Sequence, residues 1–125
     1  MLLTEDSSIA DYQIKAYTDH SVTINDVIYK HSLIVSNHQI MTDWRPTRLE
    51  DLKADDLREL LAFKAEVILL GSGNHFKMPD RALLSQFEEQ LNIEVMNTHA
   101  ACRTFAALSS EGRNVVAALI INENL

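Results

Sequence analysis

The sequence predicts an α/β fold in a single domain, with an N-terminal β-meander added to alternating helices and strands. Between residues 12 and 44, apolar residues recur with a period of two, which is typical of strands with one packed face. From residue 54 onward, helical patterns alternate with short apolar runs, which is typical of helices packed against a buried sheet. No linker or internal repeat divides the 125 residues, so we expect one domain over residues 1–125.

The N-terminal third is expected to form an antiparallel meander with one face packed on the core and the other exposed to solvent. Residues 1–10 are interpreted as a loose or edge segment. Turn-forming residues then separate short strands at Asp19-His20, at Asn25-Asp26 and at residues 36–38. Pro46 lies in a connector that leads to the first helix.

The remaining two thirds are expected to alternate helix and strand. The expected helices are 54–64, 79–91 and 98–110, and the expected strands are 67–70, 93–96 and 115–121. Asn97 or Thr98 is expected to cap the last helix, and Gly112 follows that helix as a C-cap glycine would. Asp55 and Asp56 lie in the first turn of the first helix, where we expect a solvated face.

Composition narrows the possible partners. The formal net charge of −7 and the pI of about 5.1 disfavour nucleic acid, because phosphate binding needs a basic surface. The single Cys102 excludes an intrachain disulfide and is compatible with a reducing cytoplasm. No targeting segment stands out, and the longest apolar run, Val115 to Ile121, is too short to cross a bilayer. We therefore expect a cytoplasmic protein without an integral membrane segment.

The loop after the expected strand 67–70 is the first candidate for a binding site. It begins Gly71-Ser72-Gly73 and continues with Asn74 and His75. Backbone N–H groups in such a turn form a nest that could hold an anion, and nearby basic side chains would add positive charge. Alternatively, the two glycines only let the chain turn tightly from strand to helix. The second interpretation is favoured because the loop matches neither a Walker sequence nor G-x-G-x-x-G.

Cys102 and two arginines are further candidates. Cys102 lies near the start of a helix, whose dipole could lower the pKa of its thiol. Arg103 is adjacent in sequence, and His99 or His75 would be the candidates for a base. The alternative is a small buried residue, since cysteine is among the most buried residue types. Arg103 and Arg113 could bind an anion, or could instead cap a helix or pair with a carboxylate such as Glu111.

No metal or other cofactor is expected. The five histidines are scattered along the chain, and none of them forms an H-E-x-x-H motif or another zinc-ligand spacing.

Three blocks of sequence occur in a distinctive order: EVMNT at 94–98, ACRTF at 101–105 and EGR at 111–113, followed by the AALI strand at 117–120. This order resembles a known family of small bacterial and archaeal domains of unknown function, which also contains the mitochondrial complex I assembly factor 3. The resemblance extends from about Tyr12 to Ile121. It implies a three-layer α/β fold with a mixed central sheet, a β-hairpin layer and about three helices. The chain departs from the family at Ala106, where Asn is common, and in the details of residues 74–77.

The resemblance implies no enzymatic activity, and the sequence offers no catalytic constellation. We therefore expect a non-catalytic protein-interaction or assembly-type factor with a protein partner, and an edge strand of the meander could also pair with a second copy of the chain. The alternative is a small-molecule or anion-binding protein, or an enzyme, that uses the glycine loop together with Arg103 or Arg113. The pocket for that alternative would be formed by Gly71, Ser72, Gly73, Asn74, His75, Thr98, Cys102, Arg103 and Arg113.

Overall fold

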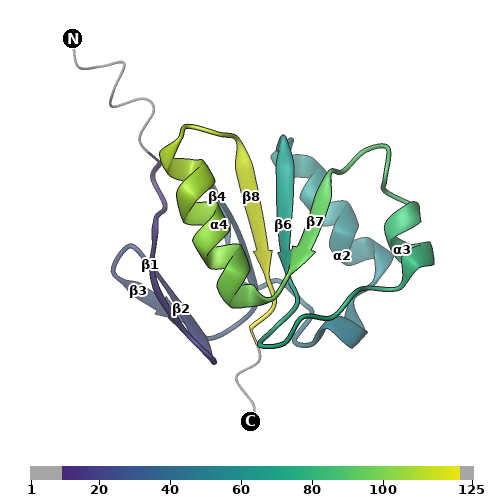
Figure 1. Ribbon diagram of the computed structural model, residues 1–125, viewed down its shortest axis with the longest axis horizontal. Coiled ribbons are helices and arrows are strands. Elements are labelled where there is room, and N and C mark those ends of the chain that lie inside the picture. The colour runs from purple at the N-terminus through teal and green to yellow at the C-terminus, as the bar shows by residue number, and fades with distance from the viewer. Residues whose placement is uncertain (1–9, 122–125) are drawn as a thin grey trace.

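The computed structural model describes residues 10–121, so the expectation for residues 1–10 lies, apart from Ala10, outside the described residues. The fold has three layers, with a five-stranded sheet in the middle (Figure 1). The order of its strands is β5 (Ile40–Met41), β4 (Leu33–Ser36), β8 (Val115–Leu119), β6 (Val67–Gly71) and β7 (Ile93–Met96). The sheet is mixed, because β6 runs parallel to both β7 and β8 whereas β4 runs antiparallel to both β5 and β8. The predicted α/β fold class is confirmed.

The N-terminal third divides between two sheets, which the sequence interpretation of a single meander missed. A separate antiparallel sheet contains β1 (Ile14–Thr18), β2 (Ser21–Ile24) and β3 (Val27–Tyr29), whereas β4 and β5 join the central sheet. In β2 only alternate residues are buried, so the expectation of one solvent-exposed face holds there. All four residues of β4 are buried, because β4 is covered on both of its faces. The expectation of one solvent-exposed face is therefore wrong for β4.

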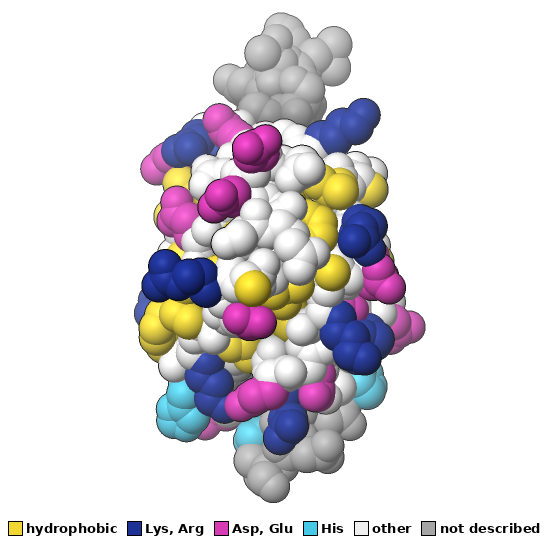
Figure 2. All heavy atoms as spheres, turned by 90° about the vertical axis from the view of Figure 1, so that its right-hand side faces the viewer, with side chains coloured by type: hydrophobic (Ala, Val, Ile, Leu, Met, Phe, Trp, Pro, Cys, Tyr) yellow, Lys and Arg dark blue, Asp and Glu magenta, His cyan; other side chains and the backbone are white. Residues whose placement is uncertain are grey.

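Helices cover the two faces of the central sheet. The helix α4 (Thr98–Ser110) packs with the three-stranded sheet on one face. Shorter elements cover the other face: η1 (Leu49–Asp51), α2 (Ala54–Arg58), η2 (Glu59–Phe63) and α3 (Arg81–Ser85). Figure 2 views the side of the molecule on which α3 lies, and charged side chains there surround patches of hydrophobic ones.

Two of the expected helices are shorter in the structure. The first changes from α-helix to 3₁₀-helix at Glu59 and ends at Phe63, because the next residue, Lys64, has a left-handed φ of 51°. The second stops at Ser85 instead of Leu91, because Gln86, Phe87 and Glu88 each donate to the residue three positions earlier. This tighter turn pattern still buries Phe87. The last expected helix, 98–110, is confirmed.

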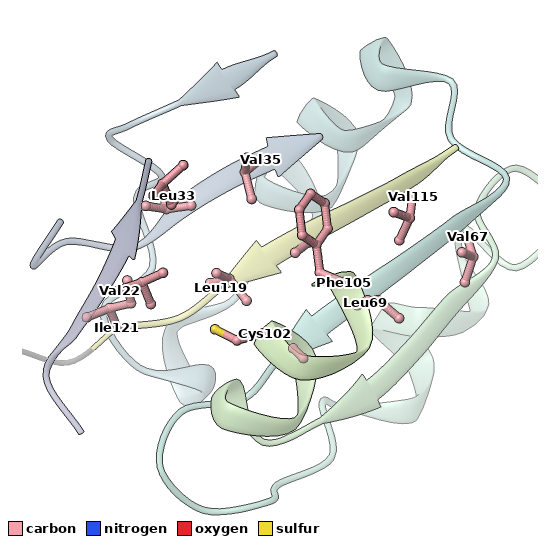
Figure 3. Close-up of a cluster of buried hydrophobic side chains, with 13 residues drawn as sticks. Val22, Leu33, Val35, Val67, Leu69, Cys102, Phe105, Val115, Leu119 and Ile121 are labelled. Atoms are coloured by element: carbon pink, nitrogen blue, oxygen red, sulfur yellow. The ribbon is translucent and has the colours of Figure 1, made fainter. Parts of the chain in front are cut away.

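The core consists of two clusters, one on each face of the central sheet. Residues of β4, β6 and β8 alternate between the clusters because successive side chains of a strand point to opposite faces. Val35, Leu69 and Ala117 face α4, whereas their neighbours Ile34, Ile68 and Val116 face α2 and α3. Figure 3 shows the first cluster, in which Phe105 and Cys102 extend from α4 toward the sheet.

An ion pair between the half-exposed Arg45 and the buried Asp56 holds the connector after β5 to α2. Asp56 is only 2% exposed, which corrects the expectation of a solvated side chain. Its carboxylate accepts hydrogen bonds from Arg45 Nε at 3.0 Å, from Arg45 Nη2 at 2.6 Å and from the backbone N–H of Lys53 at 2.8 Å. The bond to Asp56 raises the pKa of Arg45 above its ordinary value. One carboxylate therefore caps α2 and fixes the chain that enters it.

We predict that Asp56→Ala lowers the free energy of unfolding by about 2 kcal/mol, because it removes the cap bond to Lys53 and the charge-assisted hydrogen bonds from Arg45. Asp55→Ala is the matched control. Asp55 is exposed and pairs with Arg58 at the surface, so its loss should cost less than about 0.5 kcal/mol. Urea unfolding of the three proteins measures both values, and equal losses at the two positions would contradict the assigned role of Asp56.

Candidate functional site

The glycine loop begins where β6 meets the start of α4. A Cβ atom on Gly71 would lie 2.9 Å from Oγ1 of Thr98 and 3.0 Å from its Cα, so that Thr98 or the backbone would have to shift. Glycine is therefore needed at position 71 because α4 starts directly against the end of β6. Gly73 is needed for a different reason, since its φ of 109° lies in a region that other residues rarely adopt.

The buried hydroxyl of Thr98 links three segments. It accepts a hydrogen bond from the N–H of Gly73 at 2.9 Å and donates one to the carbonyl of Ile120 at 2.8 Å. The N–H of Thr98 also donates to the carbonyl of Gly73 at 2.8 Å. Asn97 is the cap of α4, since its side chain accepts from the N–H of Ala100. The N–H of Gly73, which an anion nest would use, is therefore already paired with protein.

The rest of the loop is held by its own hydrogen bonds. Ser72 Oγ donates to the carbonyl of His75 at 2.8 Å and accepts from the N–H of Lys77 at 3.1 Å. Lys77 Nζ lies 2.7 Å from Glu50 Oε2, and this bond lowers the pKa of Glu50. A surface hollow of about 290 Å³ lies between this loop and η1, and Asn74 and His75 contribute to its wall. Lys77, which lines the hollow together with Arg48 and His75, is thus paired with a carboxylate.

The two candidate arginines lie away from the loop. Arg103 Nη1 donates to the hydroxyl of Tyr17 on β1 at 2.9 Å. Arg113 follows the C-terminal end of α4, and its Nε lies 3.2 Å from Glu66 Oε1, next to the start of β6. Because Gly71 ends β6 and Glu66 precedes it, Arg113 and the glycine loop are at opposite ends of that strand. The structure brings residues 71–75 together with Thr98, and it does not bring Arg103 or Arg113 to them.

Cys102 points into the core between α4 and the sheet (Figure 3). Burial raises the pKa of its thiol from 9.0 to about 12, and the charge of Arg103 only partly offsets this effect. His99 is engaged elsewhere, because its Nε2 lies 3.2 Å from the carbonyl of Thr18 and its ring contacts Tyr17. A buried thiol that stays protonated at neutral pH fits the packing interpretation of Cys102.

The structure also reveals an apolar surface that the sequence interpretation did not single out. Phe76 and Met78 are 57% and 59% exposed, respectively, although both are large apolar residues. Met78 borders a hollow of about 390 Å³ between the loop, α3 and β7, on the side of the molecule that Figure 2 shows. Other residues lining this hollow include Pro79, Arg81, Leu84, Glu88, Leu91 and Ile93. The available sequence signal was two large apolar residues in a segment otherwise expected to be a polar loop.

Neither a metal site nor a membrane-spanning helix is present in the part of the chain that the structure describes. Within residues 10–121, no group of three or more His, Cys, Asp or Glu side chains is arranged to hold a metal ion. No helix over the same residues has both the length and the apolar character needed to cross a membrane.

The mixed sheet between two covering layers defines a small three-layer α/β domain. A family described as protein of unknown function (DUF498/DUF598) matches residues 14–120, and the chain belongs to this family. The family resemblance inferred from the sequence is confirmed, because the relatives include an assembly factor of the NADH dehydrogenase complex.

Two relatives and one solved structure illustrate the similarity. The "13 kDa major membrane protein" of Francisella tularensis is 28% identical over 122 residues, which cover 96% of this chain and 99% of that protein. The Drosophila melanogaster "NADH dehydrogenase [ubiquinone] 1 alpha subcomplex assembly factor 3" is 28% identical over 115 residues, covering 86% of this chain but only 57% of that protein. An NMR structure of a Xanthomonas campestris protein superimposes with a TM-score of 0.83 at 28% identity, covering 100% of this chain and 96% of that one.

We predict that Thr98→Val lowers the free energy of unfolding by about 2 kcal/mol, because valine keeps the shape but leaves Gly73 N–H and Ile120 C=O without their partner. Thr104→Val, at a partly exposed position of the same helix, should change the stability by less than about 0.5 kcal/mol. Urea unfolding gives the stabilities, and amide hydrogen exchange at Gly73 should accelerate only in Thr98→Val. Unchanged exchange at Gly73 would show that the hydroxyl does not hold the loop.

The raised pKa of Cys102 predicts how stability changes at high pH. Between 9.0 and about 12 the unfolded chain loses the thiol proton while the folded protein keeps it, so ionisation favours unfolding. The stability of the wild type should therefore fall relative to that of Cys102→Ala by about 1.4 kcal/mol per pH unit above 9.0. Urea unfolding at a series of pH values measures the difference in the free energy of unfolding between the two proteins. The titrations of all groups that both proteins share cancel in this difference. A difference independent of pH would mean that the thiol ionises equally in both states.

Proposed function

We propose that this protein is a non-catalytic interaction factor that binds a protein partner through the surface formed by Phe76, Met78 and the adjacent hollow. The observation that carries the proposal is that Phe76 and Met78 each expose more than half of their surface to solvent. Exposed apolar residues beside a concave surface are typical of protein-binding sites. The residues that line the hollow include the apolar Leu84, Leu91 and Ile93, so an apolar side chain of the partner fits it.

The loop that carries these side chains is held by hydrogen bonds on both sides of Met78. The Ser72 hydrogen bonds and the ion pair of Lys77 with Glu50 fix the backbone on the N-terminal side of Met78. On its other side, Asp80 caps α3 by accepting from the N–H of Ala82. A binding surface that is already ordered loses less conformational entropy on association, which favours binding.

The groups that could perform chemistry have structural roles. Thr98 and Ser72 use their hydroxyls to fix the loop, the Cys102 thiol is buried, and the two candidate arginines pair with Tyr17 and Glu66. These pairings support a role without catalysis. The Drosophila relative is named as an assembly factor, which supports a role for this chain in binding a protein partner. We also infer a cytoplasmic location, with which the free thiol of Cys102 is compatible.

The proposal is tested by capture from a native lysate of the source organism. The wild type should recover a specific partner, and Phe76→Ser combined with Met78→Ser should reduce its recovery at least about tenfold, because two apolar anchors are lost. Leu61→Ser is the matched control, since Leu61 is an exposed apolar residue on η2. Thermal melting confirms that the variants fold. Failure to recover a partner, or equal recovery by the double variant, would overturn the proposal.

A further inference from the structure

The strand β3 is an open edge of the three-stranded sheet. It pairs with β2 on one side, and no strand within residues 10–121 pairs with its other side. Val27 and Ile28 on this strand are 50% and 62% exposed. Proteins usually protect such an edge with a charge, a proline or a bulge inside the strand. The three residues of β3, Val-Ile-Tyr, contain none of these devices.

The residues that flank β3 make the edge complementary to itself. Asp26 precedes the strand and Lys30 follows it, and both are exposed. In an antiparallel pair of two β3 strands centred on Ile28, a two-fold axis brings Asp26 of each copy opposite Lys30 of the other. The same register sets Val27 opposite Tyr29. Opposite charges and apolar residues facing each other across strands are both stabilising.

The other sheet edges are less suited to such pairing. β1 is in contact with α4, which limits the approach of a second copy to this strand. β5 has only two residues. β7 carries the exposed Glu94 within the strand, so pairing two copies of β7 would bring like charges together.

We propose that two copies of this chain associate through their β3 edges, in antiparallel register centred on Ile28, to form a continuous six-stranded sheet. The contact is short, so the dimer is weak and depends on protein concentration. It leaves the proposed partner surface free, because α3, which lines that surface, lies at the opposite end of the molecule from β3 (Figure 1). The inference therefore does not depend on the proposed function.

Charge reversal tests both the edge and the register. Lys30→Asp places a second carboxylate opposite Asp26 in both halves of the pair and should weaken self-association about tenfold. Adding Asp26→Lys restores opposite charges in the same register and should restore association. Lys15→Asp on β1 is the matched control, with the same charge change at another exposed position of the same sheet. Sedimentation velocity over a concentration series gives the dissociation constants.

A second variant and a second measurement do not depend on the turn that contains Asp26. Ile28→Lys should abolish association without unfolding the protein, because Ile28 is exposed. On dilution of the wild type, NMR chemical-shift changes should be confined to β3 and its flanking residues. A wild type that stays monomeric at NMR concentrations would overturn the proposal. So would a dimer that persists in both Ile28→Lys and Lys30→Asp, or a double charge variant that fails to associate while remaining folded.

Discussion

The close contact between Gly71 and Thr98 is the constraint on which the arrangement of the layers depends. Without a side chain at position 71, the first turn of α4 lies directly against the end of β6. The Thr98 hydroxyl then bonds the loop after β6 and the chain after β8, so one side chain fixes α4 relative to two parallel strands. From that fixed start, α4 places Ala101, Cys102 and Phe105 over the sheet.

The same contact determines what the glycine loop can do. A nest for an anion needs free backbone N–H groups, and the N–H of Gly73 is bonded to Thr98. The Ser72 hydroxyl likewise bonds within the loop. The polar groups of the loop therefore stabilise its conformation, and the side chains it leaves exposed to solvent include the large apolar Phe76 and Met78.

The sequence was informative wherever one strong local signal decided the structure. The apolar runs of β6 and β8 are such signals, and so is Gly112 after α4. At the start of α4 the sequence allows either Asn97 or Thr98 as the cap, and the structure selects Asn97. The apolar stretch of β4 was too short to distinguish a fully buried strand from an alternating one. The helix expected over 79–91 was too long because Phe87 and Leu91 are buried in either a helix or a series of turns, so burial did not fix the hydrogen-bond pattern.

The candidate site was harder to predict because its partners are distant in sequence. Arg103 is adjacent to Cys102, yet successive helix residues point about 100° apart, and Tyr17 of β1 supplies its partner. Arg113 pairs with Glu66 and not with the neighbouring Glu111. Asp56 lies beside Asp55 in the sequence, but in the fold only Asp56 of the two accepts hydrogen bonds from Arg45 and from the N–H of Lys53.

The positions of the two proposed surfaces have a joint consequence. The open edge of β3 and the hollow beside α3 lie at opposite ends of the molecule, with the central sheet and α4 between them (Figure 1). A dimer joined at β3 would present two copies of the hollow facing away from each other. A partner assembly with two matching segments would then be bound at two points, which raises the effective affinity without any new contact. Because the β3 contact is short, this gain would depend on the concentration of the protein, so that weak self-association could regulate how strongly the partner is held.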